Sequence, residues 1–139
     1  MIFVFYLLSY LPLAWLHRIG SAVGWASWLL SPTYRRNMRQ NMRQALGEEG
    51  ERHFRPSAIA SAGMASLELP RIWLRTVEEA SALVTKVSGW EVVETAEKEG
   101  KGIIYLTPHL GCFEITGQYL SLHAPITALY RPPKRRWLQ

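Results

Sequence analysis

The first thirty residues form the most apolar part of the chain. Arg18 is their only formally charged side chain, and the run IFVFYLLSYLPLAWL at residues 2–16 carries no formal charge. A helix needs roughly 20 apolar residues to cross a bilayer, whereas this run is shorter, because His17 and Arg18 follow it directly. Pro12 within the run also strains a continuous helix. We therefore predict an uncleaved membrane anchor over residues 1–30, and its length leaves both spanning and interfacial placement open. The alternative is a buried core helix of a soluble protein.

Residues 31–46, SPTYRRNMRQNMRQAL, have the pattern of a helix with one basic face. Ser31 followed by a proline is a helix-start signal. Arg35, Arg39 and Arg43 recur every four residues, so they share a face. The other side is apolar, which predicts a basic amphipathic helix lying on anionic lipid headgroups. Arginines beside a hydrophobic segment also place this end of the chain in the cytoplasm. The alternative is a solvated, charged helix face that binds no ligand.

The middle of the chain is predicted to be a polar connection followed by a helix. Residues 47–56, GEEGERHFRP, are polar and contain glycine, which is typical of a loop. A helix is then predicted from residue 57 to about residue 69, where Pro70 kinks or ends it.

From residue 81 onward the pattern becomes strand-like. The β-branched run ALVTKVSGWEVV leads into a short polar helix in TAEKEGK, and the compact apolar run GIIYLT follows. A turn and a helix come next in PHLGCFEITGQYLSLH, before a second apolar run, PITALY. The order strand, helix, strand, helix, strand predicts an α/β fold with a mostly parallel sheet and flanking helices. We expect residues 31–139 to be part of such a domain, with one strand–crossover–strand unit in residues 101–130.

Composition narrows the class of protein further. The 139 residues make one domain at most, and 48% of them are hydrophobic, enough for a core. Sixteen basic against eleven acidic residues give a formal charge of +5, which with six Trp favours a membrane surface or another anionic partner. Because the basic residues cluster beside an apolar segment, no nucleic acid is expected as a partner. The single cysteine excludes an internal disulfide and a Cys-based zinc site, and we expect neither a metal nor a cofactor.

The candidate chemistry lies in the run GKGIIYLTPHLGCFE. His109 and Glu114 follow the predicted strand at residues 103–106, and open α/β sheets bind ligands at the carboxyl edge of their strands. Pro108 predicts that His109 lies on the turn before a helix, while Glu114 lies about one turn into it and reaches back to the imidazole. Gly111 removes side-chain bulk between them. A histidine oriented by a carboxylate is what a general base requires.

The run TPHLGCFE, preceded by GKGIIYL and followed by ALYRPPK, resembles the lipid A biosynthesis acyltransferases, the lauroyl and myristoyl transferases with an HxxxxE or HxxxxD motif. The resemblance covers most of the chain, because the apolar N-terminal segment, the Arg-rich helix and SGWEVVETAEKEGKG fall in the family's order. It implies transfer of a fatty acyl chain from acyl carrier protein to a hydroxyl of a lipid A precursor, in lipopolysaccharide biosynthesis. It also implies a location at the cytoplasmic face of the inner membrane of a Gram-negative bacterium.

The same resemblance implies roles for three residues. His109 would be the general base, and Glu114 would orient it. The acceptor hydroxyl would then attack the thioester carbonyl directly, so no covalent acyl-enzyme is expected, and the oxyanion would need nearby donors. Arg131 matches the arginine of the family's YRP motif and would hold a substrate phosphate or the oxyanion. The alternative for Arg131 is a surface ion pair.

Other polar residues are weaker candidates. Cys112 lies three residues from His109, but a small buried cysteine is commoner than a nucleophile. Glu68 lies in an apolar helical stretch, and burial against an arginine is one packing arrangement that stays open for it. Residues 134–136 are basic, and the alternatives for them are docking of acidic acyl carrier protein and an exposed helix start. Surface or capping roles are expected for three histidines without a carboxylate or cysteine at ligand spacing: His17, His53 and His123.

The chain differs from the resembled family in length. Family members run to roughly twice this length, so later strands and much of the acyl pocket are expected beyond Gln139. Two alternative functions therefore stay open. One is a glycerolipid or other glycolipid acyltransferase, which shares the histidine and the acid but uses HxxxxD. The other is an inactive truncated remnant bound to the membrane.

Overall fold

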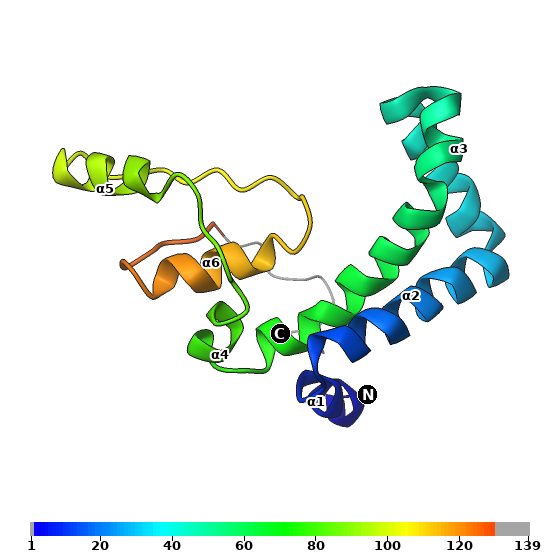
Figure 1. Ribbon diagram of the computed structural model, residues 1–139, viewed down its shortest axis with the longest axis horizontal. Helices are drawn as coiled ribbons and strands as arrows, with labels where there is room; N and C mark the ends of the chain where they lie inside the picture. Colours follow the sequence, from blue (N-terminus) through cyan, green and yellow to red (C-terminus); the bar gives the residue numbers. More distant parts are fainter. Residues whose placement is uncertain (1, 130–139) are drawn as a thin grey trace.

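The computed structural model describes residues 2–129, and the side chains from residue 3 onward. Arg131, the rest of the YRPPK run and the basic residues 134–136 therefore lie outside the described residues. The described part contains six helices (Figure 1): α1 Ile2–Ser9, α2 Leu13–Leu30, α3 Pro32–Trp73, α4 Val77–Ser81, α5 Trp90–Lys98 and α6 Glu114–Ser121.

The predicted parallel sheet is wrong, because residues 2–129 contain helices and irregular segments but no strand. The apolar run expected as a strand at residues 103–106 has no regular secondary structure, and Ile104 and Leu106 are 90% and 89% exposed. A run of apolar and β-branched residues shows only that a segment suits a sheet, whereas a strand exists through hydrogen bonds to a neighbour. The helix predicted after His109 is confirmed as α6. The helix predicted in TAEKEGK is part of α5, which begins earlier, at Trp90, so the expectation of a strand through WEVV is wrong.

Pro12 divides the apolar N-terminal run into two helices. It precedes α2 with a ψ of 143°, which ends one helix and starts the next. The strain predicted at this proline is thus resolved by a break between α1 and α2. Within residues 2–129, no helix is both long and apolar enough to span a membrane.

The longest helix, α3, reverses direction at Gly47. The basic helix predicted at residues 31–46 is confirmed as its first leg (residues 32–46), and Ser31 accepts a hydrogen bond from the Tyr34 amide at its start. Gly47 has φ 72° and ψ −179°, a conformation that is essentially restricted to glycine. The predicted polar connection at residues 47–56 is wrong, because the second leg (residues 48–73) is helical from its beginning.

The second leg of α3 runs back along α2, and glycines bring the two helices together (Figure 1). A Cβ atom on Gly63 would lie 1.9 Å from the Gly20 carbonyl oxygen and 2.6 Å from the Gly24 amide nitrogen. Glycine at these three positions therefore allows backbone contact between the helices. Leu16 and Ile59, both fully buried, complete this interface.

Helices α4, α5 and α6 form a second arm of the molecule (Figure 1). A capping box between Thr76 and Glu79 starts α4, which packs against α6. The Trp90 ring at the start of α5 lies 5.9 Å from the Tyr119 ring and 4.7 Å from the His123 ring, measured between centroids. Aromatic contacts of this kind stabilise the placement of α5 against α6.

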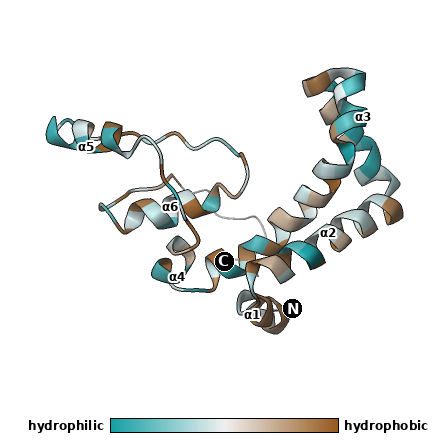
Figure 2. Ribbon diagram, viewed as in Figure 1, coloured by the Kyte–Doolittle hydropathy of each residue, from teal (hydrophilic) through white to brown (hydrophobic). Residues whose placement is uncertain are grey.

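The molecule is open, with much apolar surface in contact with solvent. Its accessible surface is 10860 Å², whereas a compact protein of this size exposes about 7,400 Å². Figure 2 shows α1 as mostly hydrophobic, while α3 is mostly hydrophilic around its reversal. The exposed large apolar side chains of α1 and α2 are Phe3, Val4, Phe5, Tyr6, Leu7, Trp15, Ile19, Val23, Trp25, Leu29 and Leu30.

Candidate active site

His109 lies in a tight turn that leads into α6, as predicted. The Leu110 amide donates a hydrogen bond of 2.8 Å to the Pro108 carbonyl, and the Ile115 amide donates to the Cys112 carbonyl. Gly111 has a φ of 56°, and a Cβ atom added to it would meet nothing within 4 Å. The expected role of Gly111 as a space-maker is therefore wrong, because the turn needs its left-handed conformation instead.

The two residues of the HxxxxE motif stand on adjacent parts of this turn. The exposed His109 ring packs on Phe113, with 4.2 Å between ring centroids. Glu114 is half-buried and is the first residue of α6, so it does not lie one turn into the helix as expected. Across residues 2–129 no hydrogen bond or ion pair joins His109 to Glu114. The expected contact between them stays a prediction.

Glu68, in the second leg of α3, pairs with a histidine from another helix. Its Oε1 lies 2.7 Å from Nε2 of His17, so α3 and α2 are joined at this point by a His–carboxylate pair. The Glu68 side chain is 17% exposed and the His17 side chain is 35% exposed. The partner of Glu68 is thus a histidine and not an arginine. The surface or capping role expected for His17 is also wrong.

Cys112 lies in the same turn as His109 and is half-buried. Burial, followed by the effects of Glu68 and the charge of Glu114, raises the pKa of the Cys112 thiol to about 12. The thiol is therefore protonated at neutral pH. This is the opposite of an activated nucleophile, whose pKa is lowered by nearby positive charge.

A second polar cluster surrounds Glu51 at the reversal of α3. The Glu51 side chain is fully buried and accepts hydrogen bonds of 2.7 and 2.9 Å from Arg55. Arg39 and Arg43 of the first leg approach its carboxylate oxygens to 3.3 and 3.7 Å. The Arg55 hydrogen bonds hold the pKa of Glu51 below its usual value against the effect of burial, and the charges of Arg39 and Arg43 act in the same direction.

The first leg of α3 carries a basic cleft of about 330 Å³. Four guanidinium groups of one helix line it. Glu51 pairs with two of them, and four positive charges on one cleft suit phosphate groups. The cleft is lined by Pro32, Arg35, Arg36, Arg39, Gln40 and Arg43.

The remaining histidines have minor roles. His123 Nδ1 lies 2.9 Å from the Tyr119 carbonyl oxygen at the end of α6, which fits the capping role expected for it. His53 is exposed on α3 beside Phe54, as expected for a surface residue. Within the described residues, no three His, Cys, Asp or Glu side chains come together in a way that could hold a metal ion.

Comparison with known families decides the assignment. A sequence model of the bacterial lipid A biosynthesis acyltransferase family matches residues 1–138, nearly the whole chain. The chain belongs to this family. No curated protein and no solved structure significantly matches the chain. The resemblance seen in the sequence is confirmed, and this family member is an acyltransferase of lipid A biosynthesis.

The pairs at Glu68 and Glu51 are the features of this acyltransferase that sequence reasoning missed. His17 and Glu68 are 51 positions apart, and no local spacing connects them. The signal at Glu68 was a single acidic residue in an apolar helical stretch. Glu51 lay in a segment read as a loop, so its position opposite Arg39 could not be inferred.

Proposed function

We propose that this chain transfers a fatty acyl group from an acyl carrier protein thioester to a hydroxyl of a lipid A precursor. The family match over residues 1–138 is the observation that carries the proposal. The exposed position of His109 on a turn supports it, because a general base must be reachable by its substrate.

In the proposed reaction, the neutral imidazole of His109 removes the proton of the acceptor hydroxyl as its oxygen attacks the thioester carbonyl. The tetrahedral intermediate then collapses, the C–S bond breaks, and the imidazolium returns its proton to the leaving thiolate of the carrier. Glu114, at the first residue of α6, is proposed to orient this imidazole, as the HxxxxE motif implies. Arg131 is proposed to hold a substrate phosphate or the oxyanion.

The test is an acyl-transfer assay with acyl carrier protein thioesters and a lipid A precursor. Removing a general base should lower kcat for His109→Ala by about 10²–10⁴-fold. His53→Ala is the matched control, because His53 is exposed on α3 and should retain the activity of the parent. Full activity in His109→Ala would disprove the assignment of the base.

The acceptor distinguishes the proposal from its nearest alternative. A glycerolipid acyltransferase would use the same histidine and a carboxylic acid, but Glu114 in HxxxxE and the family match favour a lipid A precursor. The same assay with glycerol 3-phosphate should give no product. Product from glycerol 3-phosphate alone would favour the alternative, and no product from either acceptor would favour an inactive chain.

We further propose that the protein works at the cytoplasmic face of the bacterial inner membrane. Two surfaces support this placement. Helices α1 and α2 expose aromatic and aliphatic side chains, including Phe3, Trp15 and Leu30. The basic cleft on the first leg of α3 follows directly after α2 in the chain and suits anionic headgroups.

A further inference from the structure

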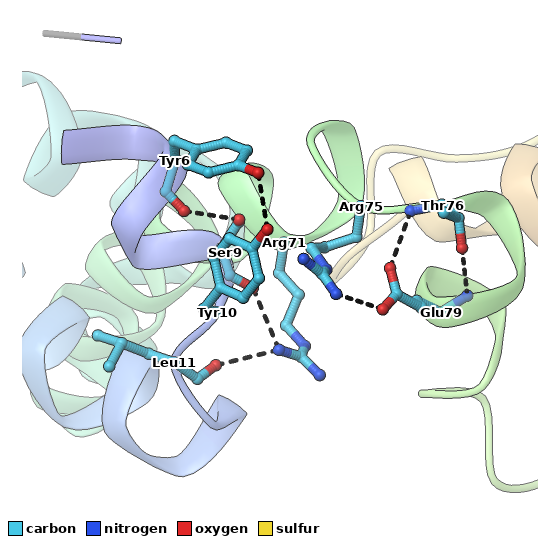
Figure 3. A network of polar contacts seen from close by, with 8 residues as sticks. All are labelled: Tyr6, Ser9, Tyr10, Leu11, Arg71, Arg75, Thr76 and Glu79. Carbon is cyan, nitrogen blue, oxygen red and sulfur yellow. Dashed lines mark hydrogen bonds and ion pairs between the residues drawn. The ribbon is translucent and has the colours of Figure 1, made fainter. Parts of the chain in front are cut away.

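The arginines of the basic cleft differ from arginines elsewhere in α3, which are engaged within the fold. Arg71 donates hydrogen bonds of 3.2 Å to the carbonyl oxygens of Ser9 and Leu11, at the junction of α1 and α2 (Figure 3). One turn later, Arg75 pairs with Glu79. Within the described part of the chain, by contrast, none of the four cleft arginines donates a hydrogen bond. Each guanidinium group has five N–H donors, so the cleft is rich in donors that the fold does not use.

Glu51 restrains two of these arginines without using their outer nitrogens. The Nε atoms of Arg39 and Arg43 lie 3.3 and 3.7 Å from its carboxylate oxygens. The hydrogen bonds to that carboxylate come from Arg55, and the buried Nε atom of Arg39 makes none. The attraction of Arg39 and Arg43 to Glu51 is therefore electrostatic. A fully buried carboxylate thus holds two partly exposed guanidinium groups at the wall of the cleft.

The size and charge of the cleft suit a small anion with more than one negative charge. Its volume of about 330 Å³ is near the lower end for ligand pockets, which span about 300–1,000 Å³. Guanidinium groups bind phosphate oxygens through pairs of parallel hydrogen bonds. A phosphate monoester carries a charge of about −1.5 to −2 at neutral pH and has three terminal oxygens, whereas a phosphodiester is a monoanion. The cleft should therefore attract a monoester more strongly than a diester.

The position of the cleft favours a phosphate that is attached to a lipid. Pro32, at the start of α3, lines the cleft. Leu29 and Leu30, the last residues of α2, are exposed. An exposed apolar surface thus comes directly before the basic cleft in the chain. This combination suits an amphiphile whose headgroup lies in the cleft and whose hydrocarbon chains contact the leucines.

We propose that the basic cleft binds the phosphomonoester headgroup of a membrane lipid and selects it over phosphodiester headgroups. Arg35 and Arg36 bind the terminal oxygens through their planar forks, and the two arginines restrained by Glu51 complete the site. The proposal rests on the proposed placement at the membrane and deepens it, because it names the chemistry of the headgroup. It assigns no chemical step to the cleft.

Sedimentation with lipid vesicles tests the selectivity. Phosphatidylcholine vesicles carry either phosphatidic acid, a monoester, or phosphatidylglycerol, a diester, in amounts that give the same zeta potential. The parent should bind the phosphatidic acid vesicles about tenfold more tightly, because only the monoester presents three terminal oxygens to the forks. Equal affinity for the two kinds of vesicle would overturn the proposal.

A conservative variant separates fork geometry from charge. Arg35→Lys with Arg36→Lys keeps both positive charges and removes the planar forks. It should bind phosphatidylglycerol vesicles within about twofold of the parent and lose most of the preference for phosphatidic acid. Arg52→Lys is the control, because Arg52 is an exposed arginine of the second leg and should keep the preference. With folding verified by circular dichroism, an unchanged preference in the double variant would overturn the proposal.

Competition identifies the occupant of the cleft. Inorganic phosphate, at the concentration of the lipid phosphate, should leave the parent on phosphatidic acid vesicles, because it has no chains to contact the leucines. Displacement by inorganic phosphate would overturn the choice of a lipid. Displacement by acyl carrier protein that disappears in the double lysine variant would assign the cleft to an acidic protein and also overturn it.

The outcomes for the cleft and for the proposed function are distinguishable. A parent that transfers acyl groups but binds the two kinds of charged vesicle equally would overturn the phosphomonoester site and leave the proposed function intact. A parent that prefers phosphatidic acid and transfers no acyl group would support the site and refute the proposed function.

Discussion

Glu51 is a charged side chain that the fold removes entirely from solvent. A buried carboxylate is costly unless it is paired, and Arg55 pairs with it through two hydrogen bonds from the same leg of α3. Arg39 and Arg43 approach from the first leg, so the carboxylate links the two legs electrostatically. Its removal would leave three guanidinium groups close together without an anion between them.

We expect Glu51→Gln to destabilise the protein at neutral pH and to lose this effect in acid. The pKa of Glu51 is lowered in the folded state from its ordinary value of 4.5, mainly by Arg55. Its contribution to stability is therefore complete above the unfolded pKa and is lost as the pH falls through the folded pKa. Urea denaturation of parent and variant between about pH 7 and about pH 3 measures the difference.

Glu48→Gln is the control for this series, because Glu48 and its partner Arg52 are 67% and 71% exposed. Exposed ion pairs contribute about 0–1 kcal/mol, so this variant should resemble the parent at every pH. A difference between parent and Glu51→Gln that does not shrink in acid would argue against the assigned ion pair.

At the residue scale, the sequence predicted the site only where the signals were local. Pro108 placed His109 on a turn because the residues beside a proline are restricted, and this was correct. The pairing of His17 with Glu68 joins helices that are distant in the chain, so neither residue carries a local mark of the other. Contacts of that kind follow from the packing of α2 on α3, which the residue types alone do not specify.

At the element scale, the crossing of α2 and α3 depends on glycines, which have no side chain, at the point of contact. We expect Gly63→Ala to destabilise the fold by about 1–3 kcal/mol or more, because its Cβ would lie 1.9 Å from the Gly20 carbonyl oxygen. Gly117→Ala is the matched control, since Gly117 is in α6 with nothing within 4 Å of an added Cβ. It should stabilise the protein by about 0.5–1 kcal/mol in urea denaturation.

The reversal of α3 depends on backbone freedom and not on space. An added Cβ at Gly47 would meet nothing within 4 Å, yet its φ of 72° with ψ near 180° is strained for any other residue. Gly47→Ala should therefore cost about 1–3 kcal/mol of the free energy of unfolding, without any clash. A cost below about 0.5 kcal/mol would indicate that the reversal at Gly47 is not maintained in solution.

Helices were predicted correctly where the periodicity of basic and apolar residues was strong. The prediction of a sheet was wrong for a physical reason. Arginines four positions apart fixed the first leg of α3 correctly. Residues 47–56 were mistaken for a loop, because glycine and charged residues are typical of both loops and solvated helices. The sheet failed because strand pairing is a non-local property, while apolar runs such as residues 103–106 report only local preference.

At the scale of the whole molecule, α1 and α2 present an apolar face that we expect to bind lipid. The double variant Leu29→Asn with Leu30→Asn removes two side chains that are 65% and 82% exposed. Binding to vesicles with anionic lipids, measured by sedimentation, should weaken about tenfold or more. Val92→Asn, at a 68% exposed position of α5, is the control and should bind as the parent does.

The basic cleft should make the same binding depend on salt. Arg35 and Arg36 line the cleft, and electrostatic attraction to headgroups falls as ionic strength rises. Replacing both with Gln should reduce binding to anionic vesicles and have little effect on binding to neutral ones. Equal loss on both kinds of vesicle would indicate general damage to the protein.

The family could be inferred from the sequence because its motif is a contiguous run around His109, and the family match confirms it. The overall arrangement of the helices could not be inferred from the sequence, since it depends on where the long helix α3 reverses and on which surfaces remain exposed. Single residues such as Gly47 decide such features, and no periodicity marks them in advance.

The backbone contact among Gly20, Gly24 and Gly63 leads us to expect an order in which the chain becomes structured. The α2–α3 pair contains the buried residues Leu16 and Ile59 and depends little on the second arm, so it should form as a cooperative unit first. In native-state amide exchange, residues 16–24 should be the slowest and residues 99–113 among the fastest. The turn that carries His109 would then take its final place only after the helical platform beneath it is complete.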